Sequence, residues 1–596
     1  MNRTIPISIL RTLALAAVLL PVAISPLSAQ QTRAERSKYL ETSTYQDVIT
    51  FIDSLQLRGA KIHVGSIGTS TEGRKIPYII ASRPLVNTPQ EAKRLSRPVV
   101  YIQGNIHAGE VEGKEALQAM VRDLVFDPRK NVLDSIVLVV VPIYNTDGNE
   151  VFKPQLVNRG SQNGPEMVGQ RPNGQQLDLN RDYVKAETPE TRGSLAMFNA
   201  WDPDLFVDLH TTDGSFHGYA LTYSPSLHPA AAIAGGTFGG AYVRDSMLPV
   251  IRERMRTRDH YQIFDYGNFS GDEGPRAGPG EKRGWSSYEH KPRYGTNYYG
   301  VRGRLSILSE AYSHDPFDRR VKSTYAFVRE VLSLTAERSR AVLALTRGSD
   351  AALEAGRIVQ VPIRAMLTKS PLMKMVIEEP LEQTAEAKAA AATAGPPAAQ
   401  GAGRGGRGGA GGRPPCAWSL TQPGVPCGMQ RSGKFLTTSM PVKDRFDATL
   451  SVKLPAAYLL RASTPDSVIA KLRLHGLAVE RFDVRLDMPG EVFRVDSAVP
   501  AGRSAFQGHN EMRVEGAWIH EEHIVMASGF VVRTSQPLGV LSALLLEPQS
   551  DDGFATWNLF DAPLAAAVTA TDAAGKQFPV YRVTGPVSVP TRLIPE

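Results

Sequence analysis

Cysteine is scarce in this 596-residue chain, which contains only Cys416 and Cys427. The two lie close together in a Pro/Gly-rich segment, with no histidine or second cysteine pair at zinc-finger spacing. The sequence therefore argues against a metal site built on cysteine. In an exported protein, where disulfides persist, the same pair predicts one local disulfide.

Long uncharged apolar runs are also missing after the N-terminus. No later stretch reaches membrane-spanning length without charges, so we expect no membrane span in the mature chain. Residues 1–29 have the pattern of a secretory signal: a basic start with Arg3, an apolar stretch over residues 12–24, and small residues around Ala29. The protein is therefore predicted to be secreted or periplasmic; the alternative is an uncleaved N-terminal anchor helix.

Two other classes of protein lack their signatures here. The net charge of +7 is not gathered on a basic face studded with aromatic residues, and the Arg/Gly tract near residues 400–413 holds no aromatic residue. We expect no nucleic-acid partner. There is no Gly-x-Ser-x-Gly sequence, so the nucleophile signature of an α/β-hydrolase is absent.

The length indicates more than one core, because single cores stop growing at roughly 250–300 residues. We expect a signal at 1–29, an α/β domain at 35–345, connecting strands at 346–380, a low-complexity Gly/Ala/Arg loop at 381–415 and a smaller, β-rich or α/β accessory domain at 416–596. The Gly, Ala and Pro content of the loop cannot build a packed core, which predicts disorder there.

Apolar runs recur along the first domain. One is RPVVYIQGNIH, an apolar strand that ends in polar residues, and another is SIVLVVVPIYN, a continuous β-branched run. Two shorter apolar runs of the same kind are PDLFVDLH and RLSILSE. Runs that are apolar on both faces indicate sheet strands covered by helices. We therefore predict an α/β fold with a mixed, largely parallel central sheet flanked by helices.

Three of these strands end in residues that can carry metal chemistry. His107 and Glu110 stand three residues apart between a strand and a helix, and together offer nitrogen and oxygen ligands suited to Zn²⁺. Alone, this spacing also fits a carboxylate stabilised by a helix dipole. His210 closes LFVDLH and Glu310 closes SILSE. Ligands of open α/β sheets gather beyond the carboxyl ends of strands, so we expect these residues to meet in one crevice.

Glu310 has two interpretations. A buried carboxylate is costly unless it is paired or lies near a cation, and activation of a metal-bound water would give it a role. The alternative is an ion pair with an arginine such as Arg304.

Candidate anion-binding groups lie between the second and third strand ends. Asn180 and Arg181 are adjacent in QQLDLNRDY, and Arg159 precedes them in LVNRGSQNGPE. Arginine suits both bidentate carboxylate recognition and oxyanion stabilisation. Ordinary surface ion pairs fit Arg171 and Arg192 better.

These residues together resemble the metallocarboxypeptidase family. The shared features cover roughly residues 35–340: Glu72-Gly73-Arg74, His-x-x-Glu followed by a helix, NTDG at 145–148, LDLNRD, and a strand-ending His and Glu. The third ligand lies in DLHTTDG, which is similar to the deacylase-like branch of the same fold.

The resemblance implies a zinc carboxypeptidase-like fold and one zinc ion per chain, bound by His107, Glu110 and His210. It implies Glu310 as general base, Arg159 as the group that polarises the scissile carbonyl, and Asn180 with Arg181 as the site for the substrate's C-terminal carboxylate. Tyr288 has the best spacing for the family's substrate-binding tyrosine, although Tyr294, Tyr298 and Tyr299 compete for that role.

The expected reaction is metal-assisted hydrolysis of a peptide bond in a peptide with a free C-terminal carboxylate. One alternative is a zinc-dependent deacylase or amidase acting on N-acyl amino acids or cell-wall peptides. A second is an inactive exported protein that binds peptides. A further histidine cluster, WIHEEHIV at 518–525, lacks His-Glu-x-x-His spacing and is predicted to be a hairpin tip.

Overall fold

The structure is a computed structural model that describes residues 31–212, 214–232, 239–270, 283–393, 419, 422 and 424–594. The predicted signal and most of the predicted low-complexity loop lie outside these ranges. No helix within them is both long enough and apolar enough to cross a membrane.

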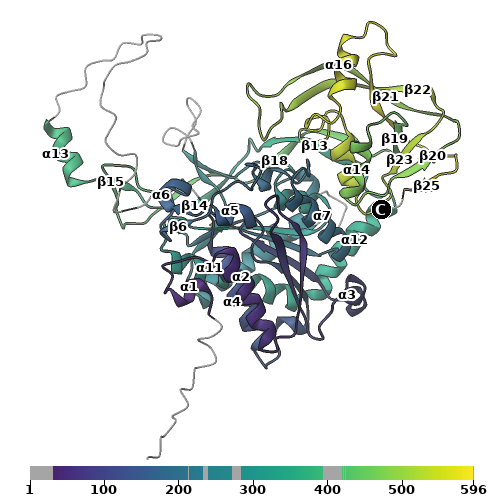
Figure 1. Cartoon of the computed structure of the whole chain (residues 1–596). Helices are drawn as coiled ribbons and strands as arrows, with labels where there is room; N and C mark the ends of the chain where they lie inside the picture. Colours follow the sequence, from purple (N-terminus) through teal and green to yellow (C-terminus); the bar gives the residue numbers. More distant parts are fainter. Residues whose placement is uncertain are drawn as a thin grey trace, which may run out of the picture.

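A mixed eight-stranded sheet forms the centre of the N-terminal region (Figure 1). Its order is β1 (Ile62–Thr69), β2 (Lys75–Ala81), β4 (Val137–Val141), β3 (Val99–Gly104), β7 (Leu205–Thr211), β12 (Leu305–Ala311), β8 (Leu221–Pro225) and β9 (Ile263–Asp265). The pairs β3–β4, β3–β7, β7–β12 and β8–β9 are parallel, and the other three are antiparallel. The predicted mixed α/β fold is confirmed.

Helices cover both faces of this sheet. On β3, Val100 and Ile102 pack with α2 (Tyr45–Leu57), α4 (Glu112–Phe126), α9 (Leu248–Arg258) and α11 (Phe317–Glu337), whereas Tyr101 packs on the opposite face with α7 (Pro189–Trp201) and α10 (Gly295–Val301). Alternate side chains of an extended strand point to opposite faces. This is why strands covered on both sides are apolar throughout.

Local sequence sets where two of these helices begin. Thr44 caps α2 by accepting the N–H of Asp47, whose carboxylate accepts the N–H of Thr44 in return. Thr188 caps α7 by accepting the N–H of Thr191, without the reciprocal bond, and Pro189 occupies the first turn, where no N–H partner is needed.

Shorter elements complete the N-terminal region. They are α1 (Arg33–Arg36), α3 (Pro89–Leu95), a 3-10 turn (Val132–Asp134), α5 (Thr146–Glu150), β5 (Lys153–Pro154) paired with β6 (Met167–Val168), α6 (Gln155–Asn158), 3-10 turns at Leu179–Arg181 and Pro229–Ala232, α8 (Gly239–Tyr242) and a π-helical turn (Val243–Met247).

The chain after α12 (Ser339–Glu354) first folds back on this region. A four-stranded sheet has the order β10 (Asn268–Ser270), β11 (Gly284–Ser286), β17 (Leu436–Lys443) and β14 (Leu372–Glu378), and β13 (Gln360–Leu367) pairs with β18 (Phe446–Lys453). Because β17 pairs with β11, the separate C-terminal sheet begins after β18, later in the chain than the boundary expected at residue 416.

Part of the segment expected to be a disordered loop at 381–415 is regular. Residues Leu381–Gln383 form β15, which pairs with β16 (Met429–Arg431), and Ala385–Thr393 form helix α13. Alanine has the highest intrinsic helix propensity, and the Gly/Pro-rich composition that opposes a helix begins only at Gly395. The prediction of a loop was therefore wrong for residues 381–393.

A seven-stranded sheet forms the C-terminal region, as expected for a β-rich accessory part. Its order is β22 (Met512–Met526), β21 (Leu486–Pro500), β24 (Gln577–Val583), β19 (Ala457–Arg461), β23 (Gly529–Arg533), β20 (Glu480–Phe482) and β25 (Arg592–Leu593), and it packs with α14 (Asp466–Leu474), α15 (Gly539–Leu546) and α16 (Asp561–Thr569).

The predicted hairpin tip at 518–525 was wrong, because these residues lie inside β22. His520 pairs with Glu491 of β21, and a register shift follows between Met488 and Gly490. The segment contains no Gly, Pro, Asn or Asp to favour a turn, so its charges mark an exposed strand face.

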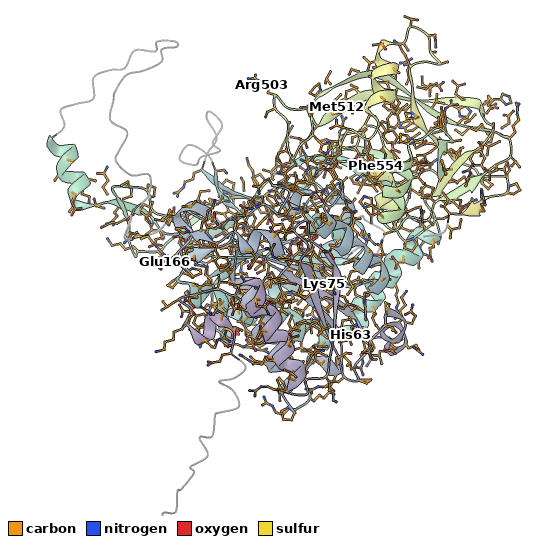
Figure 2. All side chains as sticks on the ribbon, viewed as in Figure 1. His63, Lys75, Glu166, Arg503, Met512 and Phe554 are labelled. Atoms are coloured by element: carbon orange, nitrogen blue, oxygen red, sulfur yellow. The ribbon has the colours of Figure 1, made fainter. Side chains whose placement is uncertain are left out.

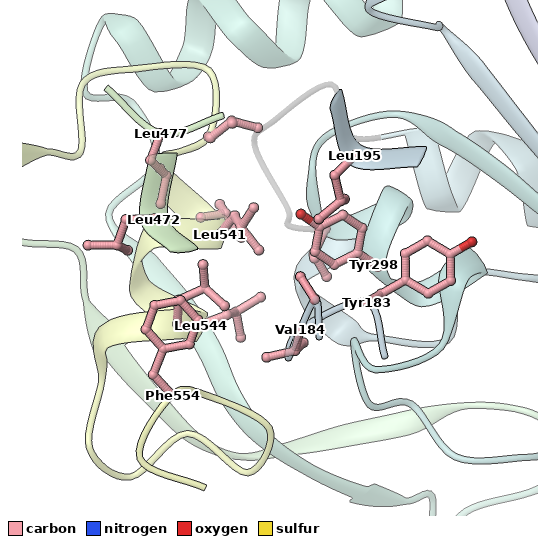
Figure 3. Packing of buried hydrophobic residues seen from close by; sticks show 14 of the residues in the cluster. Tyr183, Val184, Leu195, Tyr298, Leu472, Leu477, Leu541, Leu544 and Phe554 are labelled. Atoms are coloured by element: carbon pink, nitrogen blue, oxygen red, sulfur yellow. The ribbon is translucent and has the colours of Figure 1, made fainter. Parts of the chain in front are cut away.

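The two regions share one hydrophobic core (Figure 3). Leu541, Leu544 and Phe554 of the C-terminal region belong to the same buried cluster as Tyr183 and Tyr298. The C-terminal region therefore packs against the N-terminal region through buried hydrophobic side chains.

One of the two cysteines of the predicted disulfide lies among the described residues. Cys427 is disulfide-bonded. Cys416, with which the sequence predicts it to pair, lies outside the described residues.

Candidate active site

The three predicted strand ends meet at one edge of the central sheet. Strands β3, β7 and β12 are parallel neighbours, and Glu310 is the register partner of His210. His107 follows β3 after Asn105, whose left-handed backbone (φ 66°) turns the chain at the end of the strand. Asparagine is one of the few residues that tolerate this conformation.

His107, Glu110 and His210 form a compact buried group. His107 Nδ1 lies 3.1 Å from Glu110 Oε1 and 3.2 Å from His210 Nδ1, and His210 Nδ1 lies 3.0 Å from Glu110 Oε2. Each residue is only 3% exposed. Two imidazole nitrogens this close repel unless a proton or a cation lies between them. Ligands about 2.0–2.1 Å from a tetrahedral Zn²⁺ are about 3.3 Å apart, so the donor set fits a metal ion of this size.

Two further carboxylates fix the orientation of the histidine rings. Asp178 Oδ1 lies 2.9 Å from His107 Nε2, and Asp208 Oδ2 lies 3.1 Å from His210 Nε2. Each ring thus presents Nδ1 to the shared centre while Nε2 faces a carboxylate, which is the usual support of a metal-binding histidine. Sequence reasoning missed both aspartates, although each stands two residues before a selected residue, Asn180 or His210.

The electrostatics favour an ionised carboxylate at this centre. Although burial opposes ionisation, His107 and Arg159 hold the pKa of Glu110 well below its ordinary value. Burial also opposes the charged form of His210, but Asp208 and Glu110 raise the pKa of this imidazole well above its ordinary value. A cation bound to the three ligands would have to displace that proton, so metal binding releases protons.

A second group of potential ligands, His228, His290 and Asp551, does not have this arrangement. Nδ1 of His228 accepts the N–H of Ala230 at 3.1 Å, so Nε2 carries the ring proton and cannot donate a lone pair to a cation. His290 Nε2 contacts Asp551 Oδ2 at 2.8 Å. We therefore interpret this group as a polar contact between the two regions.

The group formed by His107, Glu110 and His210, called the metal-type group below, lines a cleft of about 580 Å³. All eight residues selected from the sequence line it: His107, Glu110, Arg159, Asn180, Arg181, His210, Tyr288 and Glu310. The structure thus brings together residues that are up to 203 positions apart in the chain, from His107 to Glu310.

Glu310 lies on the same face of the sheet as His210. Its residue is 9% exposed, and it lines the cleft beside Leu308, two positions earlier on β12. Arg304, the alternative ion-pair partner, instead contacts Asp202 at 2.7 Å and Asp350 at 2.8 Å. Arg304 is therefore engaged with these two aspartates, and Glu310 lines the cleft.

Arg159 is held by hydrogen bonds to Glu110 and to the neighbouring backbone. It donates to Gln162, to Glu110 at 3.0 Å, and to the carbonyls of Thr211 and Thr212 at 3.1 Å. A Cβ at Gly109 would lie 2.6 Å from Arg159 Cγ, so the glycine allows this packing. Four of the five N–H groups of Arg159 are thus bonded within the protein, and its role on a substrate carbonyl stays a prediction.

Arg171, for which the sequence favours ordinary ion pairs, forms two of them and also lines the cleft. It lies 3.3 Å from Glu110 Oε1 and 2.9 Å from Asp178 Oδ2, and its side chain is 37% exposed. Spacing gave no signal for this residue, because its neighbours in the cleft come from three different segments.

Asn180 and Arg181 lie side by side at the cleft wall. Asn180 Oδ1 accepts the N–H of Gly295 at 2.9 Å, and the Arg181 guanidinium carbon lies 4.1 Å from the centre of the Tyr294 ring. The amide and the guanidinium are thereby fixed within one pocket, as expected for a carboxylate site.

The four competing tyrosines separate into two pairs. Tyr298 and Tyr299 are fully buried in the core, where their hydroxyls contact His475 and Ser194. Tyr288 and Tyr294 line the cleft, with their ring centres 5.3 Å apart. Burial raises the pKa of Tyr288, so its hydroxyl stays protonated and can donate a hydrogen bond.

Fold and site together define the class of protein: an α/β protein with a buried His/Glu/His group, able to hold a metal ion, at the carboxyl ends of parallel strands. Residues 48–299 match the family model described as zinc carboxypeptidase. The chain thus contains a region, less than half of its length, that is similar to zinc carboxypeptidases. Glu310 lies just beyond the matched range.

The chain is also similar to proteins named as carboxypeptidases. The chain is 21% identical to carboxypeptidase 2 of Trichophyton equinum over 527 residues, which cover 86% of this chain and 81% of that protein. It is 33% identical to carboxypeptidase Z of Homo sapiens over 141 residues, 22% of this chain and 20% of that protein. A solved metallo-carboxypeptidase from Burkholderia cenocepacia aligns at 17% identity with a TM-score of 0.35, covering 49% of this chain and 69% of that one. At this TM-score, we draw nothing from the structural likeness.

Proposed function

We propose that the protein is a zinc-dependent carboxypeptidase that cleaves peptides at a free C-terminus. The observation that carries the proposal is one cleft that contains the His107/Glu110/His210 group, Glu310 on the neighbouring strand, and Arg181. Zinc would be held by the two imidazoles and the carboxylate. When bound, it supplies a Lewis acid that polarises a carbonyl and makes water more acidic.

Glu310 is proposed as the general base. As a carboxylate beside His210, it can take a proton from the attacking water and return it to the leaving amine. Asp178 and Asp208 keep the rings of His107 and His210 in the tautomer that presents Nδ1 to the metal.

We assign substrate recognition to the wall of the cleft that contains Asn180 and Arg181. Asn180 and Arg181 would hold the C-terminal carboxylate, and Tyr288 or Tyr294 would donate a hydrogen bond to the peptide. We propose Arg171 as the group facing the developing oxyanion, because both arginines line the cleft and the Arg171 side chain is 37% exposed, against 7% for Arg159.

The first test is the variant Glu310→Gln. Loss of a general base should lower kcat/KM by roughly 10²- to 10⁴-fold, while the zinc content stays at one per chain because Glu310 is not a ligand. Hydrolysis is followed by mass spectrometry, and zinc by elemental analysis. Glu166→Gln, an exposed glutamate outside the cleft, is the matched control. Unchanged hydrolysis in Glu310→Gln, or no zinc in the wild type, would contradict the proposal.

Paired substrates test the requirement for a free C-terminus. A peptide and its C-terminal amide differ only in the charge that Arg181 is proposed to bind. We expect release of the last residue from the free acid alone. Cleavage of N-acyl amino acids or γ-linked peptides in preference to ordinary peptides would support the deacylase or amidase alternative.

Export is proposed as well. The pattern of residues 1–29 supports it, and so does the disulfide at Cys427, because disulfides persist outside the reducing cytosol.

A further inference from the structure

The connection between β21 and β22 extends from the C-terminal sheet to the cleft. At its end, residues 506–509 form a two-residue turn, here called the tip loop. Phe506 N donates to His509 O at 2.7 Å and His509 N donates to Phe506 O at 3.0 Å. Gln507 (φ 51°) and Gly508 (φ 81°) are both left-handed, as a tight type I′ hairpin turn requires. Figure 2 labels Arg503 and Met512, which flank the tip loop along the chain.

Contacts from both regions hold the tip loop in place. His509 Nε2 lies 2.9 Å from Glu187 Oε1, next to the loop that carries Arg181. Near the base of the connection, the buried Arg293 of the N-terminal region contacts Glu511 and lies 2.6 Å from Asp552. Its guanidinium carbon also lies 5.5 Å from the centre of the Phe506 ring. The tip loop is therefore fixed at the cleft on both of its sides.

The tip loop reaches the proposed catalytic group through one hydrogen bond. Gln507 Oε1 accepts the backbone N–H of Asp178 at 2.8 Å. The carboxylate of Asp178 faces His107, and Asn180 and Arg181 follow directly in the chain. Gln507, which belongs to the C-terminal region, thus stabilises the segment Asp178–Arg181. This segment contains the carboxylate that orients His107 and the two residues proposed to bind the substrate carboxylate.

Phe506 forms part of the cleft wall. Among the described residues that line the cleft, it is the single one contributed by the C-terminal region. The lining is otherwise largely polar; Leu308 is the other side chain that is purely hydrocarbon. An aromatic ring at a polar wall offers an apolar side chain a surface that removes it from water.

We propose that the tip loop determines substrate specificity, with Phe506 packing against an apolar side chain near the C-terminus of the bound peptide and Gln507 positioning the Asp178–Arg181 segment. This inference rests on the proposed function for its substrate class. Phe506 and Gln507 lie outside the part of the chain that matches the zinc carboxypeptidase family model, whereas Asp178–Arg181 lies inside it.

Binding measurements can test this proposal even in a protein that does not turn over. The probes are two peptides that differ only at the C-terminal residues, one set apolar and one set serine. Their dissociation constants are measured by calorimetry on zinc-loaded Glu310→Gln, with and without Phe506→Ala. We expect Phe506→Ala to weaken binding of the apolar peptide roughly 3- to 10-fold and to leave the serine peptide within about 2-fold.

Phe435→Ala is the matched control, because Phe435 is 56% exposed and does not line the cleft. It should leave both affinities unchanged. Equal affinities for Glu310→Gln and Glu310→Gln/Phe506→Ala would overturn the proposal, as would equal weakening of both peptides. Absence of hydrolysis by the wild type, with peptide binding and its Phe506 dependence intact, would overturn the proposed enzyme and leave the tip loop as a peptide-binding element.

Gln507 is tested by rescue in the active protein. Gln507→Ala removes the acceptor for the Asp178 N–H and should lower kcat for both peptides by the same factor, because it displaces the positioning segment. Gln507→Glu retains an acceptor oxygen and should recover most of the loss. Failure of Gln507→Ala to change kcat, or equal loss in both variants, would remove the positioning role.

Discussion

At the scale of single residues, the carboxylates behind the two histidines decide how well the site can hold a metal ion. Asp178 keeps the proton of His107 on Nε2, and this leaves Nδ1 as a lone-pair donor. Although burial opposes ionisation, His107 and Arg171 hold the pKa of Asp178 well below its ordinary value, so the carboxylate is charged at all working pH values.

Asp178→Asn should weaken zinc binding by roughly 10- to 100-fold without large loss of stability, because it keeps the shape and removes the charge. A competition titration with a chromogenic chelator measures the affinity. Asp483→Asn, which alters an exposed aspartate of the C-terminal sheet, should bind zinc as the wild type does. An unchanged zinc affinity in Asp178→Asn would show that the ring orientation is set elsewhere.

The residues of the site differ in how far sequence could locate them. His107, Glu110, His210 and Glu310 follow apolar strands, and a strand end is visible in the residue pattern. Arg159 and Arg171 lie in irregular loops, where chain position does not determine side-chain direction. The sequence favours Arg159 over Arg171 as the group facing the substrate carbonyl, and the contacts of Arg159 with Glu110 and Gly109 are the reason that we propose Arg171 for that role.

At the scale of elements, the pair His509–Glu187 joins the tip loop to the N-terminal region. The hydrogen bond that His509 Nε2 donates to the Glu187 carboxylate raises the pKa of His509, while burial and Lys185 oppose that shift. Burial opposes ionisation of Glu187, but His509 and Lys185 lower the pKa of this carboxyl.

These opposite shifts define a pH window. The raised pKa of His509 contributes stability that is present below its unfolded value, about 6.5, and is lost as pH rises through the folded value. The lowered pKa of Glu187 contributes stability that is present above about 4.3 and is lost as pH falls through the folded value. The pair therefore stabilises most between about pH 4.5 and 6.5.

His509→Gln should lower the melting temperature more at pH 5.5 than at pH 8.5, because only the protonated imidazole gains from Glu187. Thermal unfolding at both pH values measures the difference. His523→Gln is the matched control, since its side chain is 77% exposed on the outer face of β22. Equal effects of His509→Gln at the two pH values would mean that the ion pair does not hold the tip loop.

At the scale of the whole molecule, the shared core makes the two regions depend on each other. Leu544 is 2% exposed and belongs to the cluster that also contains Tyr183 and Tyr298 beneath the cleft. Removing its side chain should cost about 2–5 kcal/mol in the free energy of unfolding. Because the cluster is continuous from Leu544 to Tyr183 and Tyr298, the loss of stability should also weaken retention of zinc by the His107/Glu110/His210 group.

Leu544→Ala should therefore lower the temperature of zinc release together with that of overall unfolding, in one calorimetric transition. A chromogenic chelator present during heating reports the release. Leu593→Ala, at a residue that is 62% exposed, should shift neither temperature. Two separate transitions, with zinc released only in the one that Leu544→Ala leaves unmoved, would show that the regions unfold independently.

The sequence by itself determined the central α/β pattern, the strand ends that carry the metal-type residues, and the β-rich character of the C-terminal region. These follow from local periodicity and from the rule that parallel strands end at a common edge. Only the tertiary structure decided what each arginine of the cleft contacts, which tyrosines are buried in the core, and where the C-terminal sheet begins. It alone brought Phe506 and Gln507 to Asp178, because contacts between residues more than three hundred positions apart leave no trace in the spacing of a single chain.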